Sequence, residues 1–176
     1  MNEQAFVLLV STSEYKLKEV FQLVLEKNLE VFSDSQIKVP TEVLREKGYT
    51  IGREDWARII YSQLQEKENP NEKLHFQNIR TIQQLFRQYF KVNIELDEDV
   101  IARIHIYFQI RHNIVHNLAI VDEQLLRNVK KTGKEFPVKV GGSYLVTEEY
   151  YALARETIAI LFDAIDKAIV AQGLNI

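Results

Sequence analysis

Segments with helical periodicity alternate with short polar breaks along the whole chain, and this pattern predicts a helical protein. Apolar residues recur at helical spacing in six segments, namely 13–32, 53–67, 74–93, 100–118, 122–129 and 148–172. Ser11 and Glu14 have the spacing of a capping box, which places the start of the first helix near residue 13. Asp97 and Thr147 are suitable N-caps for the fourth and the last helix, and Gly173 suits the end of the last one.

One segment before the last helix departs from the helical pattern. Alternating side chains over 136–140 and 144–146 flank Gly141 and Gly142, which predicts a small β-hairpin. The expected architecture is therefore an all-α bundle of about five to six helices, with a small β-hairpin before the last helix. A chain of 176 residues is long enough to bury a real core, and we expect a single domain over 1–176.

Composition and charge narrow the possible functions. The hydrophobic fraction of 46% and the charged fraction of 27% are those of a globular protein. The absence of cysteine excludes disulfides, thiolate metal sites and a cysteine nucleophile. The apolar run at 5–10 is too short for a signal sequence or a membrane span, so we expect a cytoplasmic protein without membrane association. The net charge of -3 argues against a polycation that grips nucleic acid with its whole surface.

A local basic stretch nevertheless follows the fourth helix. Its cations, with Glu135 as the single acid among them, are Arg127, Lys130, Lys131, Lys134 and Lys139. Such a stretch can attract phosphates, or it can be an ordinary solvated loop.

The chemistry of the chain is concentrated at 111–117, where the sequence reads Arg-His-Asn-Ile-Val-His-Asn. On a helical wheel, Arg111 falls in the middle of the expected apolar stripe, which consists of Val100, Ile104, Tyr107, Phe108, Val115 and Leu118. A buried arginine is costly unless it meets an anion or carbonyl groups. Arg111 therefore either forms an internal ion pair, for example with a glutamate of the first helix, or binds an anion at a cleft or subunit interface.

A ridge of polar side chains lines the opposite side of the same helix, formed by His105, Gln109, His112 and His116. The last two histidines have the four-residue spacing of metal ligands, but they also fit a polar interface pair or a general acid or base. Asn113 stands where a His-Glu-x-x-His motif has its glutamate, and Asp122 and Glu123 lie past the expected helix end. We therefore expect no metal and no other cofactor.

The segment resembles the signature motif of the HEPN superfamily (higher eukaryotes and prokaryotes nucleotide-binding). Arg111 and His116 have the Arg-x4-His spacing, with a polar residue directly after the arginine, a hydrophobic pair before the histidine and an asparagine after it. The setting is also similar over about 97–172: a small all-α domain, the motif late in a central helix, a short insertion and a long closing helix. The resemblance implies a metal-independent endoribonuclease that cleaves RNA by acid-base transesterification at a dimer interface, leaving 2′,3′-cyclic phosphate and 5′-hydroxyl ends.

The resemblance also implies a role for each motif residue. His116 would be the acid or base and Arg111 the clamp on the phosphate, while His112 would orient them. Asn113 and Asn117 would add polar contacts. The basic side chains expected to bind the substrate are Arg127, Lys130, Lys131 and Lys134. The implied partners are an RNA substrate, a second copy of the chain and an antitoxin or other neutralising protein, in a toxin–antitoxin, phage-defence or stress system.

The spacing of the two motif residues raises a geometric question. Five positions separate Arg111 from His116, which is about 140° around an ideal helix, so one straight helix does not aim both at one phosphate. Either the helix bends or ends inside the motif, or a second copy contributes across a two-fold axis. Two other functions stay open: a non-catalytic dimerisation or binding module in which Arg111 is structural, and a metal-binding helical protein that uses His112 and His116.

Overall fold

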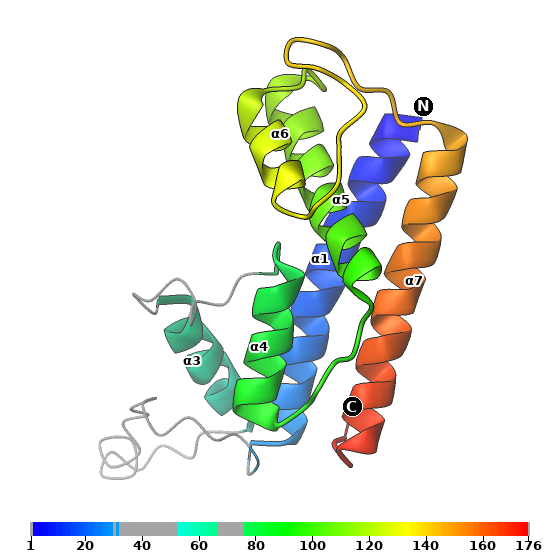
Figure 1. Ribbon diagram of the computed structural model, residues 1–176. Helices are drawn as coiled ribbons and strands as arrows, with labels where there is room; N and C mark the ends of the chain where they lie inside the picture. Colours follow the sequence, from blue (N-terminus) through cyan, green and yellow to red (C-terminus); the bar gives the residue numbers. More distant parts are fainter. Residues whose placement is uncertain (1, 30, 32–52, 67–75, 176) are drawn as a thin grey trace. The chain divides into compact units, whose positions relative to one another are not determined.

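The computed structural model describes residues 2–29, 31, 53–66 and 76–175, and these residues contain helices but no β-strand (Figure 1). Their six helices are α1 (Asn2–Lys27), α3 (Arg53–Glu66), α4 (Ile79–Phe90), α5 (Glu98–Asn117), α6 (Glu123–Lys130) and α7 (Glu148–Ala171). The predicted all-α fold class is confirmed. Residues 74 and 75, with which the third helix was expected to begin, lie outside the described residues, and α4 begins at Ile79.

The chain divides into two compact units, and α1 and α7 each contribute to both. The first unit consists of Met1–Lys16, Gln77–Ile79 and Glu95–Ile165, and the second of Leu17–Phe76, Arg80–Ile94 and Asp166–Ile176. The motif at 111–117 belongs to the first unit. The expectation of a single domain over 1–176 stays a prediction.

An aromatic cluster holds three helices of the first unit together. Phe6 of α1 lies 5.9 Å from Tyr107 of α5 and 5.9 Å from Tyr150 of α7, measured between ring centroids. The two tyrosine rings meet edge to face at 5.6 Å, a geometry that adds about 0.5–1.5 kcal/mol per pair beyond the area buried. The Tyr107 hydroxyl also lies 3.3 Å from the Thr157 hydroxyl of α7. Figure 1 shows α5, the helix that carries the motif, beside α1 and α7.

The second unit has its own core, again built on aromatic rings. Phe21 of α1 contacts three other phenylalanines at centroid distances of 5.2–5.9 Å, namely Phe76, Phe86 and Phe90. The side chain of Asn28 fastens the end of the chain to the end of α1, because it donates to the Asn175 carbonyl at 2.9 Å and accepts from the Asn175 N–H at 3.1 Å. No residue of the motif lies in this unit.

The β-hairpin predicted around Gly141 and Gly142 is wrong. This segment pairs instead with the chain that follows α5: the Gly141 N–H donates to the Val121 carbonyl at 2.8 Å, and the Val121 N–H donates to the Gly142 carbonyl at 2.9 Å. One step further, the Tyr144 N–H donates to the Ala119 carbonyl at 3.0 Å. The alternation of side chains thus indicated an extended backbone. Its hydrogen-bond partner is the chain at 119–121, whereas the hairpin prediction had paired 136–140 with 144–146.

The first helix also starts earlier than predicted, at Asn2 rather than near residue 13. The capping-box interpretation of Ser11 and Glu14 is wrong because both residues lie inside α1 and use their side chains elsewhere. The Ser11 hydroxyl accepts a hydrogen bond from Arg111 at 3.0 Å, and the Glu14 carboxylate accepts one from Gln77 at 3.0 Å. The apparent cap is therefore a pair of contacts to other parts of the first unit.

The ends of the later helices follow the sequence more closely. The Asp122 carboxylate caps α6 by accepting from the Leu125 N–H at 2.7 Å, and the Thr147 hydroxyl accepts from the Tyr150 N–H at 3.2 Å at the start of α7. Gly173, at φ +70°, closes α7 in the left-handed conformation that glycine adopts without strain. Among the described residues, no helix has the length and the apolar content to cross a membrane.

Candidate functional site

The residues 111–117 form the last two turns of α5, and the helix continues unbroken through Asn117. It ends at Leu118, whose φ of 52° and ψ of 39° are left-handed. The possibility that the helix ends inside the motif is thereby excluded. Arg111 and His116 leave the same helix about 140° apart.

Arg111 is half-buried, and its partner is neutral. Its Nε donates to the Ser11 hydroxyl at 3.0 Å, and its other N–H groups have no hydrogen-bond partner in the part of the chain that the structure describes. The side chain lines a pocket of about 210 Å³ whose other lining residues are Glu14, Gln77, Phe108, Gln109, His112, Gln124 and Asn128. Of the two interpretations of Arg111, an internal ion pair and a cleft, the geometry therefore favours the cleft.

The core-facing side of α5 differs from the expected stripe. Val115 and Leu118 were expected in the core but are 48% and 83% exposed. Ile110 and Asn113 take their place at 1% and 3% exposed, and the Asn113 side chain donates to the Ile120 carbonyl in the chain after α5. Arg111 consequently shares a partly exposed face with Val115 and Leu118, rather than lying in the centre of the buried stripe.

His112 and His116 are both exposed, and their rings lie together on the outside of the last turn. The ring centroids are 4.4 Å apart and the ring planes meet at 44°. The pair can therefore reach a substrate directly. Within the described residues, no group of three or more histidine, aspartate and glutamate side chains is arranged to hold a metal ion.

The two asparagines of the motif hold the link between α5 and α6. The buried side chain of Asn113 donates to the Ile120 carbonyl at 2.9 Å. Asn117 donates to the carboxylate of Asp122, the residue that caps α6. Both amides are therefore used to hold the link after α5 rather than being offered to a ligand.

The polar ridge of α5 is partly covered by α6, which packs along it. The Asn128 amide of α6 donates to the Gln109 side chain at 2.7 Å. Burial lowers the pKa of His105, and the positive charge of the nearby Lys131 lowers it further. The half of the ridge nearer the start of α5 is therefore sequestered, whereas His112 and His116 remain accessible.

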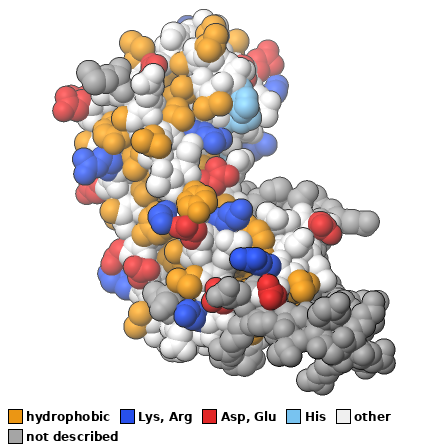
Figure 2. All heavy atoms as spheres, turned by 180° about the vertical axis from the view of Figure 1, so that it is seen from behind, with side chains coloured by type: hydrophobic (Ala, Val, Ile, Leu, Met, Phe, Trp, Pro, Cys, Tyr) orange, Lys and Arg blue, Asp and Glu red, His pale blue; other side chains and the backbone are white. Residues whose placement is uncertain are grey.

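The basic stretch does not gather around the histidines. Arg127 pairs with Glu123 at 3.2 Å on the surface of α6, and Lys130 is exposed. Lys134 donates to Asp99 in the first turn of α5, and roughly 25 Å of helix axis separates Asp99 from His116. The cations thus follow α5 from the ridge towards its N-terminal end. Figure 2 shows one face of the molecule, on which a histidine stands near Lys and Arg side chains and apolar side chains are exposed among them.

Three residues of this site were not among the sequence-derived candidates: Ser11 and Glu14 of α1, and Gln77 before α4. Ser11 bonds to Arg111, whereas Glu14 and Gln77 bond to each other and line the same pocket as Arg111 and His112. The spacing of Ser11 and Glu14 imitated a capping box, and this hid their role in the sequence.

Comparison with known proteins gave no relative: no family model matches the chain, and neither the curated proteins nor the solved structures contain a significant match.

Proposed function

We propose that the chain is a metal-independent endoribonuclease of HEPN type, which cleaves RNA by acid-base transesterification where two copies meet. The observation that carries the proposal is the exposed pair His112 and His116 beside a half-buried Arg111 at the end of one continuous helix. Acid-base groups and a cation on a rigid element are the requirements of phosphodiester transesterification without a metal.

The proposed chemistry uses two proton transfers and one charge contact. The 2′-oxygen of the RNA attacks the neighbouring phosphorus while a neutral imidazole accepts the 2′-hydroxyl proton. The bond from phosphorus to the 5′-oxygen breaks, and an imidazolium donates a proton to that leaving oxygen. In a composite site, His116 of one copy can fill both roles in turn, because the imidazolium formed by the first transfer is the donor of the second, while Arg111 of the other copy faces the same phosphate. The guanidinium of Arg111, held at Nε by Ser11, directs its remaining N–H groups to the phosphate oxygens and stabilises their charge in the transition state.

Two observations support a homodimer. The 140° angle between Arg111 and His116 suits a composite site in which each copy supplies one of the two groups to a phosphate. Large apolar side chains are also exposed on both helices that meet at Arg111 and Ser11: Leu8 (68%) and Tyr15 (57%) on α1, Val115 (48%) and Leu118 (83%) on α5. Apolar side chains grouped in this way are typical of a surface that another chain covers. We call these four residues the apolar face.

The same apolar face favours a second candidate function, a non-catalytic dimerisation or binding module in which the contact between Arg111 and Ser11 is structural. A toxin–antitoxin, phage-defence or stress role, a neutralising partner and a cytoplasmic location belong to the first proposal and come from the resemblance of the motif.

The test is cleavage of a mixed RNA panel in EDTA by the wild type and by His116→Ala, Arg111→Ala and the control Arg155→Ala. Arg155 is an exposed arginine of α7 outside the motif. We expect cutting by the wild type and the control, with 2′,3′-cyclic phosphate ends, and loss of cutting in both motif variants while their circular dichroism spectra stay unchanged. Well-folded dimers of the wild type that cut no RNA would leave the binding module as the function.

A further inference from the structure

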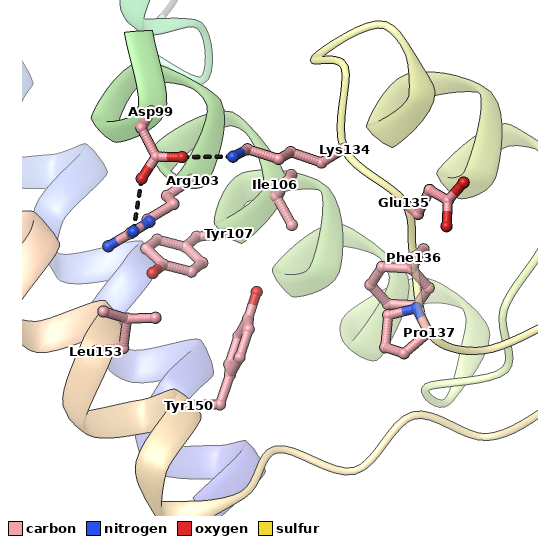
Figure 3. A pocket seen from close by; sticks show the side chains of 10 residues that line it. All are labelled: Asp99, Arg103, Ile106, Tyr107, Lys134, Glu135, Phe136, Pro137, Tyr150 and Leu153. Atoms are coloured by element: carbon pink, nitrogen blue, oxygen red, sulfur yellow. Dashed lines mark hydrogen bonds and ion pairs between the residues drawn. The ribbon is translucent and has the colours of Figure 1, made fainter. Parts of the chain in front are cut away.

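A second pocket of the first unit lies at the other end of α5, between that helix, the loop after α6 and the start of α7 (Figure 3). Its volume is about 230 Å³. The residues that line it are Asp99, Arg103, Ile106, Tyr107, Lys134, Glu135, Phe136, Pro137, Tyr150 and Leu153. None of them belongs to the motif, and only Lys134 was singled out from the sequence.

The walls of this pocket are mostly aromatic and apolar. Figure 3 shows Tyr107 and Tyr150 on one side of the space, Phe136 and Pro137 on the other, and Ile106 between them. The flat rings stay in place because Tyr150 contacts Tyr107 edge to face, and Phe136 lies 5.0 Å from the buried Tyr144. Burial raises the pKa of Tyr150 above its ordinary value, so its hydroxyl remains a neutral polar group in the pocket. The space therefore suits a flat, uncharged ring with polar edges.

The mouth of the pocket carries charged side chains of both signs. Arg103 and Lys134 both pair with Asp99, and the hydrogen bond from Lys134 is the main reason why the pKa of that carboxyl lies below its usual value. The four charged residues that line the pocket are two cations, Arg103 and Lys134, and two carboxylates, Asp99 and Glu135, so their formal charges cancel. Figure 3 shows the Glu135 carboxylate turned away from the space between the rings. Arg103 and Lys134 each have more N–H donors than their contact with Asp99 uses, so a phosphate at the mouth can accept hydrogen bonds from both.

We propose that this pocket binds one unstacked nucleobase of a single-stranded RNA, with the adjoining phosphate against Arg103 and Lys134. The inference rests on the proposed function for the identity of the ligand as RNA. Aromatic side chains accept the face of any base, and stacking is worth about 1–3 kcal/mol per base. The volume is below the range of pockets for drug-sized ligands, which fits a single base better than a larger molecule.

The position of the pocket gives it a role in recognition rather than in cleavage. It adjoins Asp99, about 25 Å along α5 from His116, and cations of the basic stretch lie between the middle of α5 and the pocket, with Lys131 near His105 and Lys134 on Asp99. A strand bound at the histidines can thus reach the pocket after several nucleotides. The pocket would set affinity and base preference at a position away from the cut.

The experiment measures binding of small probes, independently of cleavage. AMP, UMP and ribose 5-phosphate are titrated by isothermal calorimetry and NMR into the wild type and into His116→Ala, which keeps the pocket intact. We expect AMP or UMP to bind both proteins alike and ribose 5-phosphate to bind at least about fivefold more weakly, since it lacks the base. Phe136→Ala should weaken the binding of the mononucleotide at least about fivefold.

Two further variants separate pocket loss from misfolding. Leu153→Trp fills the space from a half-buried position on α7 and should abolish binding of the mononucleotide in a folded protein. Lys134→Gln should weaken it, whereas Lys139→Gln, an exposed lysine of the same loop outside the pocket, should not.

The outcomes distinguish this inference from the proposed function. If ribose 5-phosphate binds as tightly as AMP, the pocket is only an anion site and the proposal is overturned. Mononucleotide binding that is unchanged in folded Leu153→Trp would also overturn it, because the ligand would then bind elsewhere. RNA cleavage by a wild type that binds no mononucleotide would overturn the pocket alone. If the wild type cuts no RNA but binds a mononucleotide, and Leu153→Trp abolishes that binding, the pocket proposal is supported and the nuclease proposal fails.

Discussion

The Nε of Arg111 on α5 donates a 3.0 Å hydrogen bond to the hydroxyl of Ser11 on α1, and the two residues are 100 positions apart in the sequence. A hydroxyl does not neutralise a guanidinium. The contact therefore fixes the direction of the side chain and leaves its positive charge for another group. It differs from an ion pair, because no carboxylate of the described residues is bonded to Arg111, although Glu14 lines the same pocket. Under the proposed function, the phosphate of the RNA would meet this charge.

The first prediction concerns this contact. Ser11→Ala should lower the free energy of unfolding by about 1 kcal/mol, the net value of one hydrogen bond. It should also slow RNA cleavage by roughly tenfold or more, because the guanidinium loses its positional restraint. Arg111→Lys should not retain the cleavage activity of the wild type, since the lysine ammonium lacks the planar set of donors that a guanidinium directs to a phosphate. Urea denaturation and initial cleavage rates measure these effects. Ser143→Ala, at an exposed serine, is the control, and full activity of both Ser11→Ala and Arg111→Lys would contradict the role given to the pair.

The second prediction compares how much the two asparagines of the motif contribute to the free energy of unfolding. Asn113 is 3% exposed and donates to the Ile120 carbonyl, so Asn113→Ala should lower the free energy of unfolding by about 1–3 kcal/mol. Asn117 is less buried, and its partner Asp122 keeps the Leu125 N–H as a second contact. Asn117→Ala should therefore lower it by only about 0.5–1.5 kcal/mol. Urea denaturation of both variants checks the order, and a larger loss in Asn117→Ala would show that the link is held differently.

The ends of a helix could be predicted from the sequence where contacts between residues close in sequence fix them. Thr147 caps α7 as expected, because a cap needs only a hydroxyl or carboxylate two or three residues before the N–H that it accepts from. Asp97 stands directly before α5 as predicted, but its side chain makes no capping hydrogen bond, and Asp122, which was not predicted as a cap, caps α6. The start of α1 could not be read in this way. Ser11 has the right spacing for a cap, but its hydroxyl meets Arg111 from a distant part of the chain, and no local pattern reveals that contact.

The candidate site shows the same limit. A helical wheel places Arg111 and the histidines relative to one another, and their separation on α5 follows from it. The wheel does not show which face the rest of the molecule covers. The buried side at the end of α5 is set by the chain at 119–121, and the covered half of the polar ridge by the contact between Gln109 and Asn128. Both depend on how the chain turns after Leu118.

The third prediction uses the pH dependence of stability. Burial lowers the pKa of His105 in the folded protein below its ordinary value of 6.5. The unfolded chain then binds more protons than the folded one as the pH falls below about 6.5, so His105 lowers the free energy of unfolding at acid pH and has no such effect above that value. His105→Gln should therefore lose less stability than the wild type between pH 7.5 and pH 5.5. Urea denaturation at both values measures the difference, and an equal or greater loss in the variant would refute the effect of burial.

The last prediction tests the apolar face without disturbing the fold. Leu118 is 83% exposed and has a φ of 52°, a conformation that asparagine adopts more readily than leucine. Leu118→Asn should therefore leave the free energy of unfolding of the monomer unchanged or slightly raised. It should also weaken a dimer built on this face at least about tenfold, because burying one leucine side chain contributes about 1.5–3 kcal/mol.

Analytical ultracentrifugation over a concentration series gives the dissociation constant for each variant. Leu145→Asn is the matched control, since Leu145 is 71% exposed and belongs to the loop before α7 rather than to the apolar face. If Leu145→Asn dissociates the dimer while Leu118→Asn does not, the two copies meet through a different surface. His116 would then have to act with Arg111 of its own chain, which α5 holds about 140° away.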